Sequence, residues 1–169
     1  RVGCVANLRP VKNVDGLIRA ARLVLDRVPR VTFTVAGDGD QRPELERLRV
    51  SLGLGDRFRL LGSVADVPGF LGSVDVVASP SHSEGMSNAV LEAMAAGRAV
   101  VGTAVGATPT LLGECGVIVP PGDEAALADA VVRLLLDPVR VAALGAATRA
   151  RAEAHYGRAA AVRRFEAFY

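Results

Sequence analysis

Residues 79–97 read SPSHSEGMSNAVLEAMAAG, and this stretch decides the fold. It follows a short, β-branched apolar run at residues 74–78, which is typical of a buried strand. After a polar loop, Ser87 or Asn88 supplies the N-cap of a run of good helix formers that ends at Gly97. Open α/β sheets bind anionic ligands where a strand leads through a loop into a helix N-terminus. The stretch therefore predicts an anion-binding crevice in an α/β fold.

Strand-like and helix-like segments alternate along the rest of the chain, which indicates a parallel sheet covered by helices. We expect strands at 2–6, 31–36, 57–61, 75–78, 99–103 and 117–119. We expect helices at 14–28, 41–52, 124–136, 139–155 and 159–169, a short helix or turn at 66–72, and a Gly-rich connection between the last two strands. The helix at 14–28 has the clearest apolar stripe, at helical spacing on one face. We therefore predict a Rossmann-like, doubly wound parallel sheet of about six strands, in a single domain over residues 1–169.

The composition limits the classes of function. The chain has 169 residues, half of them apolar, and a formal net charge of +2, which excludes a disordered chain and a general nucleic-acid-binding surface. It contains no apolar run of about 18 residues, so we expect no transmembrane segment. Cys4 and Cys115 lack metal-ligand spacing and are interpreted as reduced thiols of a cytoplasmic protein. Because the chain starts at Arg1 inside an apolar run, we expect a fragment of a longer protein.

Two carboxylates flank the loop-to-helix junction of the opening stretch. The first-turn amides of residues 85–88 have no helical partner and favour an anion such as a diphosphate. Glu92 lies four residues after Asn88 and so on the same helical face, from which its carboxylate can accept hydrogen bonds from a ribose diol. Glu84 lies in the loop, where a sugar would be within reach. The alternative for Glu92 is an ordinary surface residue, although its apolar neighbours make this less favourable.

A turn after the first strand carries the only lysine of the chain, Lys12. In a doubly wound fold this turn faces the ligand crevice, so Lys12 can reach phosphate oxygens as a point charge. The alternative is a solvated loop lysine, and Arg9 has the same two interpretations. The turn has no G-x-G-x-x-G pattern and is therefore not a dinucleotide fingerprint.

The opening stretch, with seven residues between Glu84 and Glu92, resembles the donor-site signature of a known family. The family is that of the retaining, GT-B-fold glycosyltransferases of family 4, or glycosyl transferases group 1. The resemblance continues in the order and spacing of ANLRPVK at 6–12, VAGDG at 35–39, LLGSV at 60–64 and GVIVPPGD at 116–123. It implies one half of a GT-B fold, namely the C-terminal, donor-binding domain of a two-domain enzyme whose N-terminal acceptor domain is absent from this chain.

The resemblance also implies roles for individual residues. The diphosphate of a UDP- or GDP-sugar is expected at Lys12 and at the amides of Gly85, Met86, Ser87 and Asn88. Glu92 is expected to bind the ribose, the backbone near Val64 to lie close to the base, and Glu84 to contact the transferred sugar without being assigned as a nucleophile. No metal or other cofactor is expected, because basic side chains and helix amides stabilise the leaving diphosphate. The expected acceptor is a glycan, lipid or small molecule, and any peripheral membrane contact is expected through the missing domain.

The sequence departs from the family at three places. Asn7 occupies the position of a usual arginine, and Arg9, two residues on, is predicted to replace it at the diphosphate. Ala107 and Thr110 replace a glycine and a glutamate of a turn, and Ala99 replaces a proline. Two alternatives to a transferase stay open: an epimerase or hydrolase of nucleotide sugars, and a non-catalytic nucleotide-binding or interaction domain.

The C-terminal residues carry a separate prediction. Phe165, Phe168 and Tyr169 concentrate aromatic side chains in the expected helix at 159–169. This helix is expected to pack on its own domain, to cross to the missing domain, or to pair with a second copy of the chain.

Overall fold

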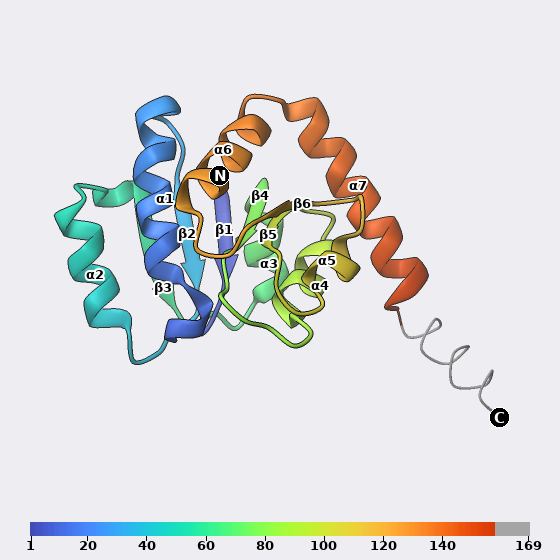
Figure 1. The fold of residues 1–169 in the computed structure, drawn as a ribbon, viewed down its shortest axis with the longest axis horizontal. Helices are drawn as coiled ribbons and strands as arrows, with labels where there is room; N and C mark the ends of the chain where they lie inside the picture. The colour runs from blue at the N-terminus through green and yellow to red at the C-terminus, as the bar shows by residue number, and fades with distance from the viewer. Residues whose placement is uncertain (158–169) are drawn as a thin grey trace.

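A computed structural model describes residues 1–157 of the chain, so the expected helix at 159–169 and its self-association lie outside the described residues. Within them, six parallel strands form one sheet in the order β3-β2-β1-β4-β5-β6 (Figure 1). The strands are β1 (Val2–Val5), β2 (Phe33–Ala36), β3 (Phe58–Gly62), β4 (Val76–Ser79), β5 (Ala99–Thr103) and β6 (Val117–Val119). The predicted doubly wound sheet is confirmed, and each strand lies within two residues of its expected bounds.

The strand order reverses direction between β1 and β4. The chain builds outward from β1 to β3 on one side and then returns to build β4 to β6 on the other. β1 and β4 pair at only two positions, Val2 with Val76 and Gly3 with Val77, whereas β1 and β2 pair at four. The carboxyl ends of β1 and β4 therefore separate, and such a switch point is where α/β sheets of this kind bind ligands.

Helices cover both faces of the sheet and give it two separate cores. One face carries α1 (Val14–Arg27), α2 (Arg42–Ser51) and α6 (Glu124–Leu135), and Figure 1 shows α6 beside α1. The other carries α3 (Val67–Gly72), α4 (Asn88–Ala95), α5 (Thr108–Leu112) and the later turns of α7 (Pro138–His155). The stripe predicted for α1 is buried at Leu17, Ile18, Ala21, Val24 and Leu25. Because helices pack on both faces of the sheet, the loops that follow the strands meet at the carboxyl edge of the sheet.

The structure differs from the sequence-based expectation at α5. The sequence predicts a Gly-rich connection without a helix between β5 and β6, but residues Thr108–Leu112 form a helix with Pro109 in its first turn. Two residues of this helix, Leu111 and Leu112, have buried side chains. A single helical turn is too short to produce a periodic apolar pattern, so packing of two leucines rather than periodicity decides this segment.

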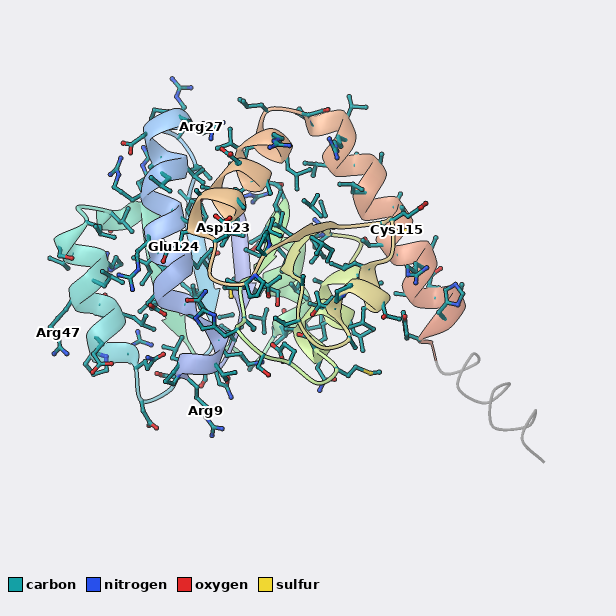
Figure 2. The ribbon with its side chains drawn as sticks, in the orientation of Figure 1. Arg9, Arg27, Arg47, Cys115, Asp123 and Glu124 are labelled. Atoms are coloured by element: carbon teal, nitrogen blue, oxygen red, sulfur yellow. The ribbon has the colours of Figure 1, made fainter. Side chains whose placement is uncertain are left out.

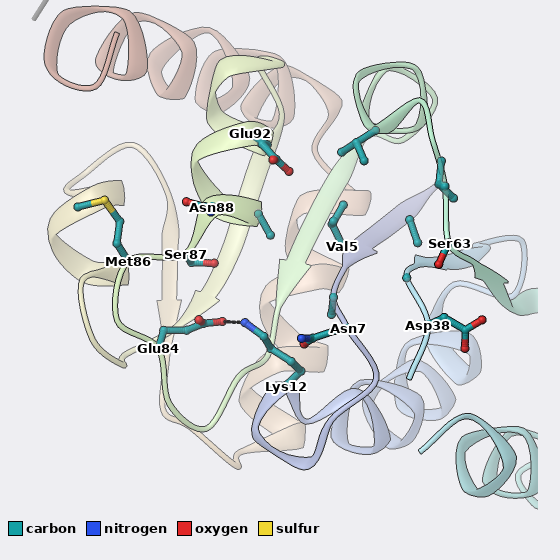
Figure 3. A pocket seen from close by; sticks show the side chains of 16 residues that line it. Val5, Asn7, Lys12, Asp38, Ser63, Glu84, Met86, Ser87, Asn88 and Glu92 are labelled. Atoms are coloured by element: carbon teal, nitrogen blue, oxygen red, sulfur yellow. Dashed lines mark hydrogen bonds and ion pairs between the residues drawn. The ribbon is translucent and has the colours of Figure 1, made fainter. Parts of the chain in front are cut away.

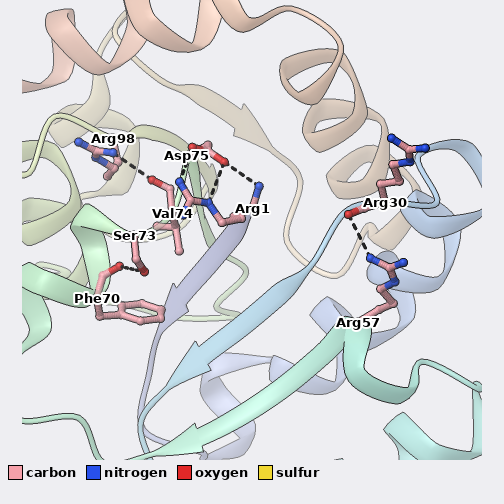
Figure 4. A network of polar contacts seen from close by, with 8 residues as sticks. All are labelled: Arg1, Arg30, Arg57, Phe70, Ser73, Val74, Asp75 and Arg98. Carbon is pink, nitrogen blue, oxygen red and sulfur yellow. Dashed lines mark hydrogen bonds and ion pairs between the residues drawn. The ribbon is translucent and has the colours of Figure 1, made fainter.

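An ion pair joins β1 and β4 at the amino edge of the sheet (Figure 4). The amino group of Arg1 donates to Asp75 Oδ2 at 2.8 Å, and both side chains are about half exposed, at 60% and 48%. Partial burial alone would raise the pKa of Asp75, but hydrogen bonds from the amino group and guanidinium of Arg1 outweigh it and hold the pKa below its usual 3.8. Next to this pair, Arg98 donates to the carbonyl of Val74 at 3.0 Å.

No helix within residues 1–157 combines the length and the apolarity that crossing a bilayer requires. Both cysteines are free thiols, Cys4 buried in β1 and Cys115 half-buried before β6.

Candidate functional site

A pocket of about 570 Å³ opens at the carboxyl ends of β1, β2 and β3, facing the start of α4 (Figure 3). Its lining residues come from four separate segments of the chain: Val5, Ala6, Asn7 and Lys12; Ala36, Gly37 and Asp38; Ser63, Val64 and Val67; and Glu84, Met86, Ser87, Asn88, Ala89 and Glu92. Seven of the predicted site residues are among them, namely Lys12, Val64, Glu84, Met86, Ser87, Asn88 and Glu92. The volume lies within the usual range for small-molecule sites.

Lys12 and Glu84 form an ion pair inside this pocket. Lys12 ends a 3-10 turn, Pro10–Lys12, after β1, and its Nζ donates to Glu84 Oε1 at 2.6 Å. The two side chains are only 22% and 9% exposed. The pair is therefore largely withdrawn from water, and its attraction must offset a desolvation cost that an exposed pair does not have.

The turn that carries Lys12 is fastened to the loop after β4. Asn13 adopts a left-handed conformation at φ 51°, and its Oδ1 accepts from Gly16 N, which caps α1. The Nδ2 of the same side chain donates to the carbonyl of Pro80 at 3.1 Å. Two residues away on each segment, His82 N donates to the carbonyl of Val11 at 2.8 Å. These two bonds hold the lysine turn and the loop in one arrangement.

Ser81 links the same loop to β5 and to Glu84. The hydroxyl of Thr103 donates to the carbonyl of Ser81 at 2.6 Å, and the hydroxyl of Ser81 donates to Glu84 Oε1 at 2.8 Å. Ser81 and Thr103 are buried, at 2% and 3% exposed. Glu84 Oε1 thus accepts from Ser81 and from Lys12, and Oε2 has no hydrogen-bond partner within residues 1–157.

Gly106 supports the backbone of the Glu84 loop from the far side. It adopts φ +50°, and a Cβ at this position would lie 1.9 Å from the carbonyl oxygen of Glu84. Beside it, Ala107 N donates to the carbonyl of Gly85 at 2.9 Å. Only glycine fits at position 106, because any side chain would collide with the loop. At Ala107, where the sequence departs from the family, the backbone hydrogen bond to Gly85 is still formed.

The N-terminus of α4 forms another wall of the pocket. Of the two N-cap candidates in the sequence, Ser87 and Asn88, Ser87 is the N-cap, and its side chain accepts from Val90 N at 3.4 Å. The amides of the first turn lack helical acceptors, and Ser87, Asn88 and Ala89 line the pocket. Glu92 is exposed and lies one turn further along α4 (Figure 3). Unlike that of Glu84, the carboxylate of Glu92 has no hydrogen-bond partner within the described part of the chain.

Two predicted diphosphate residues are not among the lining residues. Arg9 is exposed and points outward from the turn (Figure 2), while Asn7, at the position of the family's arginine, lines the pocket. Gly85 is exposed in the loop just before the lining residue Met86. The roles predicted for Arg9 and Gly85 stay predictions.

Sequence reasoning missed Asp38 and Ser63, which line the end of the pocket near Val64. Asp38 is held by its own turn, because Oδ1 accepts from Gly39 N at 2.9 Å. The signal that could have found both residues is topological. They directly follow β2 and β3, and the carboxyl ends of neighbouring parallel strands meet at one edge.

The thiol of Cys4 lies close enough to the pocket to respond to its charges. Burial raises the pKa of Cys4 to about 12, while the Lys12 charge acts to lower it and the Glu84 charge to raise it. Cys4 is therefore protonated and unreactive at neutral pH.

The sequence matches the model of the family described as "Glycosyl transferases group 1" over residues 1–137. It is 32% identical over 163 residues to a GDP-mannose-dependent monoacylated alpha-(1-6)-phosphatidylinositol monomannoside mannosyltransferase of Corynebacterium glutamicum, covering 92% of this chain and 43% of that protein. It is 38% identical over 165 residues to a D-inositol 3-phosphate glycosyltransferase of Salinispora tropica, covering 89% and 34%. The chain thus spans less than half the length of these relatives.

Solved structures share the fold. HepE of Anabaena in complex with UDP has a TM-score of 0.92 and 26% identity, covering 99% of this chain and 47% of that one. The C-terminal domain of the glycosyl transferase group 1 protein LpcC of Francisella tularensis has a TM-score of 0.85 and 28% identity, covering 93% and 86%.

Proposed function

The chain belongs to the glycosyl transferases group 1 family, and on that premise we propose that it is the donor-binding domain of a retaining glycosyltransferase of family 4. Its substrate is a UDP- or GDP-sugar, from which a hexosyl group passes to a glycan, lipid or small-molecule acceptor. The observation that carries the proposal is a single pocket at the switch point that gathers the lysine, a helix N-terminus and two glutamates.

The diphosphate lies between Lys12 and the first turn of α4. Lys12 is the only lysine in the chain, and its ammonium lies inside the pocket. The unpaired amides at Ser87 and Asn88 supply donors that are already oriented, and the helix dipole favours negative charge there. Together they stabilise the charge that develops on the leaving diphosphate, so that no metal ion is required. Full activity of the enzyme with its acceptor domain in the presence of a chelator is the expected result, and loss of that activity restored by Mg²⁺ or Mn²⁺ would contradict the metal-independent mechanism.

The positions of the ribose, the base and the sugar follow from the order of the residues that line the pocket. Glu92, exposed on the first turns of α4, accepts hydrogen bonds from the ribose diol. The base lies toward Val64, and the transferred sugar lies against Glu84. The names of the relatives support both nucleotides, since one is a GDP-mannose-dependent enzyme and HepE was solved with UDP.

The whole enzyme is larger than this chain. The chain covers 43% of the mannosyltransferase relative but 86% of a solved C-terminal domain. We place the acceptor site in a separate N-terminal domain, and the isolated 169-residue chain therefore transfers nothing. The free cysteines support a cytoplasmic location, because reduced thiols are usual there.

Calorimetric titration of the 169-residue chain with UDP and with GDP tests the proposal. We expect binding to at least one nucleotide, and a loss of about 1 to 3 kcal/mol of binding free energy in Glu92→Ala, because a charged hydrogen-bond acceptor is removed. Arg47→Ala is the control, since Arg47 lies on α2 outside the pocket lining (Figure 2). Absence of binding to either nucleotide at millimolar concentration, with the fold intact, would favour a non-catalytic domain. Product analysis of the enzyme with its acceptor domain separates transfer from epimerisation or hydrolysis.

A further inference from the structure

We propose that Ser81 is a positioning residue for the donor sugar, because its hydroxyl fixes the carboxylate of Glu84 and leaves one oxygen of that carboxylate directed at the substrate. The inference rests on the proposed function and deepens it. It concerns a residue that lies outside the pocket lining and acts through Glu84.

Glu84 is anchored through only one of its two carboxylate oxygens. Its Oε1 accepts from Ser81 at 2.8 Å and from Lys12 at 2.6 Å, whereas Oε2 has no partner within residues 1–157. Anchoring one oxygen of a carboxylate sets the direction of the other. Glu84 Oε2 is therefore held in position to accept a hydrogen bond from a sugar hydroxyl.

Lys12 and Ser81, the two donors to Glu84, differ in how they respond to a bound diphosphate. A diphosphate competes with Glu84 for the ammonium of Lys12, which sits on a flexible stem. Ser81 is uncharged and buried at 2% exposure, so a phosphate has no comparable hold on it. We expect Ser81 to retain Glu84 when Lys12 turns to the diphosphate.

Ser81 itself is kept in place by hydrogen bonds from two other segments of the chain. Thr103 on β5 donates to the carbonyl of Ser81 at 2.6 Å, and Asn13 donates to the preceding carbonyl of Pro80 at 3.1 Å. Residues from β5 and from the start of α1 thus fix the serine from two directions. Positioning of Glu84 is therefore built into the sheet and the helix rather than into the loop alone.

The test compares the affinity of the 169-residue chain for nucleoside diphosphates with its affinity for nucleotide sugars. UDP, UDP-glucose, GDP and GDP-mannose are titrated into the wild type, Ser81→Ala, Glu84→Ala and the double variant, after urea denaturation has established that each is folded. We expect Ser81→Ala to lower the sugar's contribution, the ratio of the two dissociation constants, by about 2- to 10-fold, the range for one hydrogen bond. The affinity for UDP or GDP alone should change less than about 2-fold. In the Glu84→Ala background the serine substitution should have no further effect on the ratio.

Ser83→Ala is the matched control, because Ser83 is exposed in the same loop and makes no hydrogen bond within residues 1–157. A purely structural role for Ser81 would weaken nucleotide and nucleotide sugar equally and would persist without Glu84; either result overturns the inference. If the wild type binds no nucleotide, the proposed function fails first and the inference falls with it.

A second measurement does not depend on the choice of sugar. Crystal structures of the wild type and of Ser81→Ala, each with the bound nucleoside diphosphate, should show the Glu84 carboxylate in its present place in the wild type and displaced in the variant. An unmoved Glu84 in Ser81→Ala would overturn the inference while leaving nucleotide binding intact.

Discussion

Two ion pairs link the segments that flank β1 and β4, one before the strands begin and one after they end. At the amino edge, Arg1 and Asp75 meet at 2.8 Å with both side chains about half exposed. At the carboxyl edge, Lys12 and Glu84 meet at 2.6 Å with exposures of 22% and 9%. Each pair joins a cation near β1 to a carboxylate near β4 at a similar distance. The two pairs differ in the exposed fraction of their side chains.

The difference in solvent exposure distinguishes an ordinary surface ion pair from one that belongs to a preorganised site. Exposed pairs contribute little to stability, because the high dielectric of water weakens their attraction and ordering two long side chains costs entropy. The Lys12–Glu84 pair carries a desolvation cost, and Ser81, Thr103, Asn13 and Gly106 all support the loop that holds it. A partly buried charged pair beside a pocket, supported by several surrounding residues, is typical of functional sites.

Gly106→Ala should have the largest effect, because it breaks the carboxyl-edge arrangement directly. The new Cβ would lie 1.9 Å from the carbonyl oxygen of Glu84 at a φ of +50°. We expect a loss of about 2 to 4 kcal/mol of unfolding free energy in urea, from backbone strain plus overpacking. Gly53→Ala is the control, since Gly53 has φ +64° and nothing within 4 Å, so it should cost only about 1 kcal/mol. Equal losses in the two variants would refute the close contact.

Lys12→Met sharpens the comparison of the two pairs. It leaves Glu84 nearly buried with Ser81 as its remaining partner at Oε1, and we expect a loss of about 1 to 3 kcal/mol in unfolding free energy. Asp75→Asn at the amino edge should cost less than about 1 kcal/mol. Equal costs would mean that burial does not distinguish the pairs. Adding Glu84→Gln to Lys12→Met should recover part of the loss, because no uncompensated charge remains.

Thr103→Val tests the support behind the loop. The hydroxyl that donates to the Ser81 carbonyl is lost, and we expect a cost of about 1 to 2 kcal/mol in urea denaturation. Thr108 offers a matched control, because its hydroxyl is buried without a partner among the described residues. Thr108→Val should therefore be neutral or slightly stabilising. A neutral Thr103→Val would show that this bond does not hold the loop.

The smallest effect should come from pH at the amino edge. The pKa of Asp75 is lowered in the folded chain, so the stability that it contributes is present above its ordinary pKa of 3.8 and is lost as pH falls through the lower folded value. The difference in unfolding free energy between the wild type and Asp75→Asn should be constant near neutral pH and fade in acid. A difference that persists unchanged at the lowest pH at which the chain folds would contradict the lowered pKa.

Much of the fold was predictable because it depends on local pattern. The α1 stripe, the Ser87 cap and the alternation of strands and helices are visible in the sequence, and they place Lys12 and Glu84 at one sheet edge. The helix α5 was not predictable, because it is one turn long and depends on tertiary packing.

The inner workings of the site depend on contacts between distant parts of the chain. Lys12 and Glu84 are 72 residues apart, and Thr103 and Ser81 are 22 apart. Serine and threonine hydroxyls can donate to many kinds of acceptor. The residue type therefore does not reveal which carbonyl or carboxylate a given hydroxyl will contact. Asp38 and Ser63 were missed for a different reason: both lie in quoted stretches, VAGDG at 35–39 and LLGSV at 60–64, but no role was assigned to either side chain, although topology places both at the pocket edge.

The central claim is that the pocket at the carboxyl edge binds a nucleoside diphosphate through Lys12 and the start of α4. A crystal structure of the 169-residue chain with UDP or GDP tests it most directly. We predict phosphate oxygens within hydrogen-bond distance of Lys12 Nζ and the amides at Ser87 and Asn88, and the ribose hydroxyls at Glu92. A nucleotide bound outside this pocket, or inside it with the Lys12–Glu84 pair intact and the phosphates directed away from α4, would contradict the account.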